Sequence, residues 1–153
     1  TRVHDTDSEP TMTLVPALTA FCESLGTQTG ATVGLGRPDD SATGIYVWPW
    51  KLEEITVSRA LSPRRAPGGG TAAPQDAMGV HVLVLVRPAL TPGGLALLET
   101  ARRAIYDQPV LNVSGKRVQI LFEPLSHADL AAVFGAAGLP LTICLSVLLR
   151  DAA

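Results

Sequence analysis

The succession of helices and strands is clearest in the second half of the chain, where residues 98–111 are LETARRAIYDQPVL and residues 123–150 are EPLSHADLAAVFGAAGLPLTICLSVLLR. The first block has apolar residues at helical spacing and then turns at a proline into an apolar pair. In the second block, Ser126 and Asp129 are placed as the N-cap and third residue of a helix, which Gly138 would end. Each block therefore joins a helix to a strand, which predicts a fold that mixes both kinds of element.

A hairpin and a closing strand are predicted from short-range signals in the same region. Residues 110–113 and 117–122 flank Ser114-Gly115, a dipeptide typical of a two-residue hairpin turn. Residues 141–149 alternate apolar side chains and predict the closing strand. Alternation predicts these core-facing residues: Val118, Ile120 and Phe122 in the hairpin, and Ile143, Leu145 and Val147 in the closing strand.

A central strand and another helix are predicted just before the first block. Residues 80–86 are VHVLVLV, so both faces are apolar, which is typical of a strand inside a sheet. Thr91 and Pro92 then suit the N-cap and first position of a helix. From residue 80 onward the order is β-α-β-β-α-β, and right-handed crossovers would give an α+β fold with a mainly antiparallel sheet and its helices packed on one face, as in a split βαβ domain. The inward face of the helix is predicted to contain Leu95, Leu98, Ala101 and Ile105.

The first half of the chain adds one more helix. Residues 1–12 are polar and predict a flexible N-terminal tail, while residues 13–25 predict a helix that ends at Gly26. A chain of 153 residues is long enough for one core, so residues 13–150 are predicted to form a single α+β domain. The inward face of the helix would contain Leu14, Leu18, Phe21 and Leu25.

Short strands and a long loop are predicted between this helix and the central strand. Residues 26–36, rich in Gly and Thr, could hold a short edge strand, and residues 56–61 could form another. Residues 45–48 predict a firmer strand, which Pro49 would end. Residues 62–77, SPRRAPGGGTAAPQDA, have no periodic apolar side chains and predict a mobile loop.

Several of these segments, in this order and spacing, resemble the cap, or tail-terminator, proteins of phage-tail-like contractile injection systems. The resemblance rests on the D-x-P-V-L turn of residues 107–111, the E-P-L-S helix start of residues 123–126 and the closing strand of residues 141–150. Residues 45–48 match the early aromatic strand of that family more faintly. The resemblance implies a tail-terminator-like fold and a structural, non-enzymatic role.

The family also implies partners and a location. A cap of this kind is a ring of six identical chains, seated on the last ring of the inner tube at the end distal to the baseplate, where it ends the growth of tube and sheath. Its partners would be other copies of itself, the inner tube protein and the sheath protein. Assembly would take place in the cytoplasm, as part of a particle that cell lysis releases.

Composition excludes several other classes of function. The chain has 12 Lys and Arg against 14 Asp and Glu, so it lacks the clustered positive charge of a nucleic-acid binder. A net charge of −2 also provides little repulsion between copies, which favours self-association. No apolar run approaches the roughly 20 residues that span a membrane, and residues 1–12 lack the apolar core of a signal peptide. A soluble cytosolic protein is expected.

The sequence offers little catalytic chemistry. Cys22 and Cys144 lie in apolar patterns, in a helix and a strand, and are expected to be buried free thiols. His4, His81 and His127 have no metal-ligand spacing, and His127 is expected at the surface of a first helical turn. The glycine-rich segments lack the motifs that bind phosphates or dinucleotides. We therefore predict no catalytic residue, no metal and no cofactor.

The candidate partner interface consists of Trp48, Trp50, Arg59, Arg64 and Arg65. The tryptophans would lie on one side of an extended segment, where two large rings either cover the core or anchor an interface. Core packing is the commoner role. The arginines could pair with an acidic surface, although solvated charge is the commoner state of such residues.

Two other functions fit parts of the sequence. A regulatory or small-ligand-binding module of split βαβ type would suit the order of elements, and it would bind a small ligand as a monomer. A small hydrolase or transferase would need Cys22 or Cys144 as a nucleophile, and its turnover would be sensitive to thiol reagents.

Overall fold

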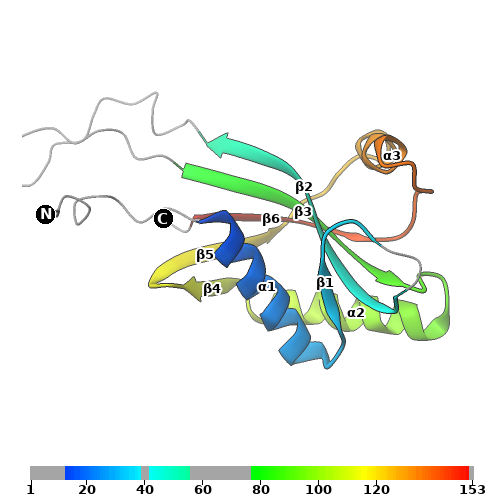
Figure 1. Ribbon diagram of the computed structural model, residues 1–153, viewed down its shortest axis with the longest axis horizontal. Helices are drawn as coiled ribbons and strands as arrows, with labels where there is room; N and C mark the ends of the chain where they lie inside the picture. The colour runs from blue at the N-terminus through cyan, green and yellow to red at the C-terminus, as the bar shows by residue number, and fades with distance from the viewer. Residues whose placement is uncertain (1–12, 39–41, 56–76, 152–153) are drawn as a thin grey trace, which may run out of the picture.

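The computed structural model describes residues 13–38, 42–55 and 77–151, which form a six-stranded sheet with three helices (Figure 1). The strand order across the sheet is β1-β2-β3-β6-β5-β4. The predictions for residues 1–12 and 56–61 lie outside the described residues, as does the predicted loop up to residue 76. Ala77, assigned to that loop from the sequence, is the first residue of β3. The elements are α1 (Leu14–Thr29), β1 (Val33–Leu35), β2 (Gly44–Ile55), β3 (Ala77–Arg87), α2 (Pro92–Asp107), β4 (Val110–Val113), β5 (Lys116–Phe122), α3 (His127–Ala136) and β6 (Leu145–Asp151).

The sheet is mixed but mainly antiparallel, as predicted. Only β1 and β2 pair in parallel among the described strands. The central position of β3 is confirmed, because it pairs with β2 on one side and β6 on the other. Residues 80–86 of this strand are all buried, with valines toward one face and His81, Leu83 and Leu85 toward the other.

The two faces of the sheet carry different helices, which corrects part of the expected arrangement. The larger core lies between the sheet and the helices α1 and α2, where Phe21 and Leu98 pack with the valines of β3. A smaller core lies on the opposite face, where Phe134 of α3 packs with Leu83 and Leu85. Figure 1 shows α1 and α2 below the sheet and α3 above it. Helices on one face are therefore found for α1 and α2 only.

The path of the chain explains why α3 lies apart. Strands β5 and β6 are adjacent and antiparallel, so α3 lies within a hairpin-like connection. The handedness rule applies only to crossovers between parallel strands, and it leaves the face of such a helix undetermined. Strands β3 and β4 lie at opposite ends of the four-stranded part β3-β6-β5-β4 of the sheet, with no parallel pair between them. The split βαβ arrangement is therefore wrong for this chain.

The N-terminal helix is longer than predicted. It continues through Gly26 to Thr29 and ends at Gly30, whose φ of 74° is left-handed and whose N–H donates to the Gly26 carbonyl oxygen. An interior glycine costs a helix only about 1 kcal/mol, whereas a left-handed terminus strongly favours glycine. The predicted inward face is confirmed, since Leu18, Phe21 and Leu25 are buried.

Strand β2 continues past Pro49, which was expected to end it. Strand β1 stops at Leu35, opposite Val47, so from Trp48 onward β2 has only β3 as a partner among the described strands. A proline is tolerated at an edge, where its missing N–H need not remove a ladder bond. The register with β3 shifts between Pro49 and Lys51, and the strand then runs on to Ile55.

The turns and caps of the second half agree closely with the sequence analysis. Ser114 and Gly115 have φ values of 54° and 80°, which form the predicted hairpin turn between β4 and β5. The Thr91 side chain caps α2 by accepting from the Gly94 N–H, and Ser126 caps α3 in the same way.

Three residues that were predicted to face the core, each near the end of a helix or strand, are exposed in the structure. Strand β6 begins only at Leu145, so Cys144 precedes it, and Ile143 is 47% exposed. Phe122 and Leu95, also predicted to face the core, are 43% and 41% exposed. Alternation assigns a side chain to a face but does not say how far the opposing layer extends over that face.

Candidate interaction surface

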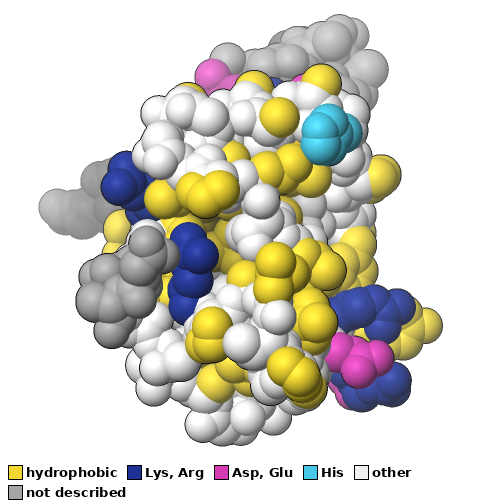
Figure 2. Space-filling view, turned by 90° about the vertical axis from the view of Figure 1, so that its right-hand side faces the viewer, with side chains coloured by type: hydrophobic (Ala, Val, Ile, Leu, Met, Phe, Trp, Pro, Cys, Tyr) yellow, Lys and Arg dark blue, Asp and Glu magenta, His cyan; other side chains and the backbone are white. Residues whose placement is uncertain are grey.

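A groove lies between β2 and α3. Trp48, Pro49 and Trp50 form one wall, and the small side chains of Ala132 and Ala136 belong to the other. The groove has a volume of about 540 Å³. We call this feature the tryptophan groove. At one end of the molecule, hydrophobic side chains gather in several patches among other side chains and backbone (Figure 2).

Both tryptophans face α3, so the prediction that they share one side is confirmed. The Trp48 ring meets Phe134 edge-on, with centroids 5.5 Å apart and an interplanar angle of 84°. The Trp50 ring lies 5.4 Å from the His81 ring at 47°. Each tryptophan packs against the smaller core and is only partly buried, so each contributes to the core and also lines the groove.

The charged part of the groove is not the one predicted. Arg59, Arg64 and Arg65 lie outside the described residues. Arg37 lies at the groove instead, where its Nη1 donates to the Ala137 carbonyl oxygen at 3.1 Å. No local pattern in the sequence indicates this contact, because the two residues are 100 positions apart.

A buried histidine lies beside the groove. His81 is 6% exposed, and both ring nitrogens contact glutamates: Nδ1 lies 2.7 Å from Oε1 of Glu123, and Nε2 lies 2.8 Å from Oε1 of Glu53. Ionised carboxylates only accept hydrogen bonds, so both contacts are satisfied when the ring carries two protons. We call these three residues the His81 cluster. It joins β2, β3 and the segment after β5.

The electrostatics of the His81 cluster favour that charged state. Burial acts to lower the pKa of His81, but the hydrogen bonds and charges of Glu123 and Glu53 together outweigh burial and raise this pKa above its ordinary value. The hydrogen bond from His81 lowers the pKa of Glu53. The charge of Lys51, whose Nζ lies 4.0 Å from Oε1 of Glu53, lowers this pKa further. The two contacts and the raised pKa of His81 therefore favour a protonated ring held between two glutamate side chains.

The His81 cluster was not predicted from the sequence, although one signal for it was present. His81 is the one polar residue in an otherwise apolar run, and a buried polar group needs a partner. Its two partners could not be identified, because they depend on strand register and on the order β3-β6-β5. His127 is exposed in the first turn of α3, as predicted, and His4 lies outside the described residues.

The two cysteines are poorly suited to nucleophilic chemistry. Cys22 and Cys144 are free and partly buried. Burial raises the pKa of Cys144 to about 11, and burial with the nearby charge of Glu23 does the same for Cys22. Reactive thiols have a lowered pKa, so the thiolates needed by a cysteine hydrolase or transferase are disfavoured.

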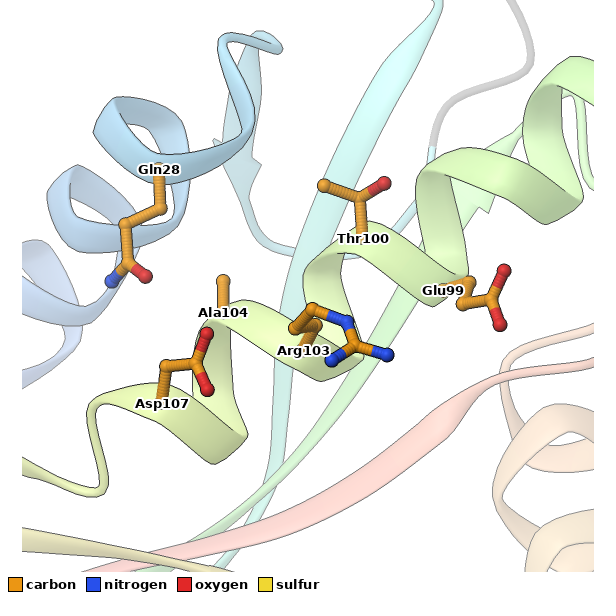
Figure 3. A pocket seen from close by; sticks show the side chains of 6 residues that line it. All are labelled: Gln28, Glu99, Thr100, Arg103, Ala104 and Asp107. Carbon is orange, nitrogen blue, oxygen red and sulfur yellow. The ribbon is translucent and has the colours of Figure 1, made fainter.

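A second depression is polar and open to solvent. It lies between the end of α1 and the outer side of α2, has a volume of about 340 Å³, and is bordered by Gln28, Glu99, Arg103 and Asp107 (Figure 3). Figure 3 shows Glu99, Arg103 and Asp107 spread along α2 and Gln28 on α1, not converging on one point. Among residues 13–38, 42–55 and 77–151, no group of three or more His, Cys, Asp or Glu side chains is arranged so that it could hold a metal ion. Over the same residues, no helix is long and apolar enough to cross a membrane.

A second apolar surface lies on the other side of α3. Leu90, in the loop between β3 and α2, is 78% exposed, and Leu141 and Ile143, between α3 and β6, are 40% and 47% exposed. With Leu130 of α3 they border a shallow hollow of about 450 Å³. We call Leu90, Leu141 and Ile143 the aliphatic patch. The structure therefore has two separate apolar surfaces, one on each side of α3.

Comparison with known proteins gives the fold a context. No protein-family model matches the sequence, and no curated protein matches it. Among solved structures, the chain is similar to the tube-terminating cap of the anti-feeding prophage, with a TM-score of 0.70 and 16% identity over 92% of this chain and 55% of that chain. It is also similar to the PVC sheath/tube terminator of an extracellular contractile injection system in its extended state, with a TM-score of 0.68 and 14% identity over 94% of this chain and 57% of that chain. The chain thus spans little more than half the length of either structure, and over that length it has the fold of the terminating caps of contractile injection systems.

Proposed function

We propose that this protein is the cap of a contractile injection system, a structural terminator that closes the tube and sheath at the end distal to the baseplate. The observation that carries the proposal is the shared fold, which extends over 92% of this chain in the comparison with the anti-feeding prophage cap. The same fold is found in a protein described as terminating both sheath and tube. The expected partners are the inner tube protein and the sheath protein.

The role is mechanical and not catalytic. A tube end presents exposed subunit edges that continue to recruit subunits until a complementary surface covers them. A terminator needs shape and apolar contact area for this task, and the tryptophan groove and the aliphatic patch supply exposed apolar surface. We assign Trp48 and Trp50 to a partner interface, together with Arg59, Arg64 and Arg65.

The assembly that suits this role is a ring of six copies, formed in the cytoplasm before the particle is released. A ring matches the symmetry of a tube end, so that each copy meets one equivalent tube subunit. The low net charge of −2 supports close packing of identical chains. The alternative of a split βαβ ligand-binding module loses its structural basis, because the strand order β3-β6-β5-β4 is not that of such a module.

Deletion of the gene tests the proposal. Cells without this protein should assemble particles with an intact baseplate but with tubes of irregular length, or without a stable sheath, in negative-stain electron micrographs. Expression of the wild-type chain from a plasmid should restore uniform length. Particles of normal, uniform length with a closed end in the deletion strain would exclude a cap role.

A further inference from the structure

We infer that copies of this chain associate head to tail, with the aliphatic patch of one copy packed into the tryptophan groove of the next. The inference deepens the proposed function and rests on it, since a ring of identical chains needs one repeated contact. It identifies the two surfaces that make that contact.

The two surfaces lie on different sides of one element, the helix α3. Residues in an α-helix are separated by about 100°, so Ala132 and Ala136, at the groove, lie roughly 200–240° around α3 from Leu130, at the patch. Two different surfaces on one subunit form a head-to-tail contact, which repeats until a ring closes or a filament grows. A groove that met only another groove would stop at a dimer.

The tryptophan groove and the aliphatic patch are also chemically complementary. The groove has one wall with the two tryptophan rings and another with alanine side chains, and about 540 Å³ of space. The patch offers an exposed leucine and two further aliphatic side chains. Exposed apolar residues are ordinary when scattered singly, but gathered in patches they mark interaction sites. Each surface presents what the other can cover.

A contact between the patch and the groove would also bury little charge. The side chains of the patch and its hollow are uncharged, and Arg37 is the one charged side chain among those that line the groove. Arg37 already donates to the Ala137 carbonyl oxygen at the groove margin, so it can remain at the rim of the contact. An interface with an apolar centre and a polar rim has the usual anatomy of a stable contact.

The test uses one charged substitution on each surface. Leu90→Asp alters the patch at a residue that is 78% exposed, and Ala132→Glu alters the groove at an exposed helical position. Neither side chain supports the core, so folding should be preserved, as circular dichroism and thermal melting would verify. Matched controls are Leu95→Asp on α2 and Ala131→Glu on α3, which lie on neither surface.

The measurement is mass in solution by light scattering and sedimentation, at concentrations up to about 1 mM. The wild-type chain and both controls should exceed the 16.0 kDa of one chain, with a mass that rises with concentration. Each of the two surface variants should associate at least about 100-fold more weakly, because a charge would be desolvated in an apolar contact. Both should therefore remain single chains.

Mixing the two variants distinguishes a head-to-tail contact from a symmetric one. The Leu90→Asp chain keeps its groove and the Ala132→Glu chain keeps its patch, so an equimolar mixture should form dimers of twice 16.0 kDa and nothing larger. A wild-type chain that stays at 16.0 kDa, controls as impaired as the variants, or a mixture without dimers would each overturn the inference. Particle length in the deletion strain is a separate readout, so the cap role can stand when the inference fails.

Discussion

Replacement of His81 by glutamine should lower stability, and the loss should depend on pH. Glutamine can still donate to one carboxylate, but it has no charge and cannot serve both glutamates of the His81 cluster. A hydrogen bond to a charged group contributes about 1.5–3 kcal/mol. The Glu123 side chain is 21% exposed and the Glu53 side chain 41% exposed, so solvent screens the second bond more than the first. We therefore expect a loss of about 2–3 kcal/mol at the pH of greatest effect.

The two shifted pKa values set the pH window. The pKa of His81 is raised in the folded state, so its contribution is complete below the ordinary value of 6.5 and is lost as pH rises through the folded value. The pKa of Glu53 is lowered, so its contribution is present above the ordinary value of 4.5 and is lost as pH falls through the folded value. The difference between wild type and variant should be largest between these two ordinary values and should shrink in alkaline solution.

Urea denaturation of the wild type and of His81→Gln, at pH 5.5 and at pH 9, measures the difference in their free energies of unfolding. His127→Gln is the matched control, because His127 is exposed on the first turn of α3, and it should leave the free energy of unfolding nearly unchanged at both pH values. A difference for His81→Gln that is equal at the two pH values, or that grows with pH, would refute the reasoning. It would mean that the buried ring is neutral in the folded protein.

Three further predictions concern packing. Gly94→Ala should destabilise the protein by about 1–3 kcal/mol in thermal melts, because a methyl group there would overlap a backbone carbonyl oxygen of the loop before α2. A methyl group at Gly93 would meet open space, so Gly93→Ala should be neutral or stabilising in the same thermal melts. Phe134→Ala should cost about 3–5 kcal/mol in urea denaturation, since this 1% exposed ring is the centre of the smaller core, and a loss below about 1 kcal/mol would contradict that role. Leu145→Ala should cost about 2 kcal/mol, because the side chain is partly buried against the larger core. Ile143 is exposed, so Ile143→Ala should cost much less. Equal denaturation midpoints for the two variants would contradict the finding that the covered strand β6 begins only at Leu145.

Local signals in the sequence predicted local structure well. The hairpin at Ser114-Gly115 and the caps at Thr91 and Ser126 depend on a few neighbouring residues, and each is found as predicted. The central position of β3 also followed from its own composition, since a strand that is apolar on both faces must be covered on both. These features are determined by the residues that form them.

Features that depend on distant residues were missed or wrong. The face occupied by α3 depends on β5 and β6 being neighbours, and no residue within the helix encodes that relation. The contact of Arg37 with Ala137, at the tryptophan groove, joins residues that are 100 positions apart in the chain. The end of a core face is equally non-local, because Ile143 has the pattern of a core residue but lies beyond the layer that would cover it.

The His81 cluster and the tryptophan groove are mechanically related. From Trp48 onward, β2 has one partner strand among those described, so the backbone of this wall of the groove is paired on one side only. Glu53, further along the same strand, is tied to His81 of β3, and His81 is tied across β6 to Glu123. Trp50 packs directly on the His81 ring between these ties. A wall fixed in this way loses little conformational freedom when a partner binds, and such preorganisation strengthens a contact that must recur identically in every copy.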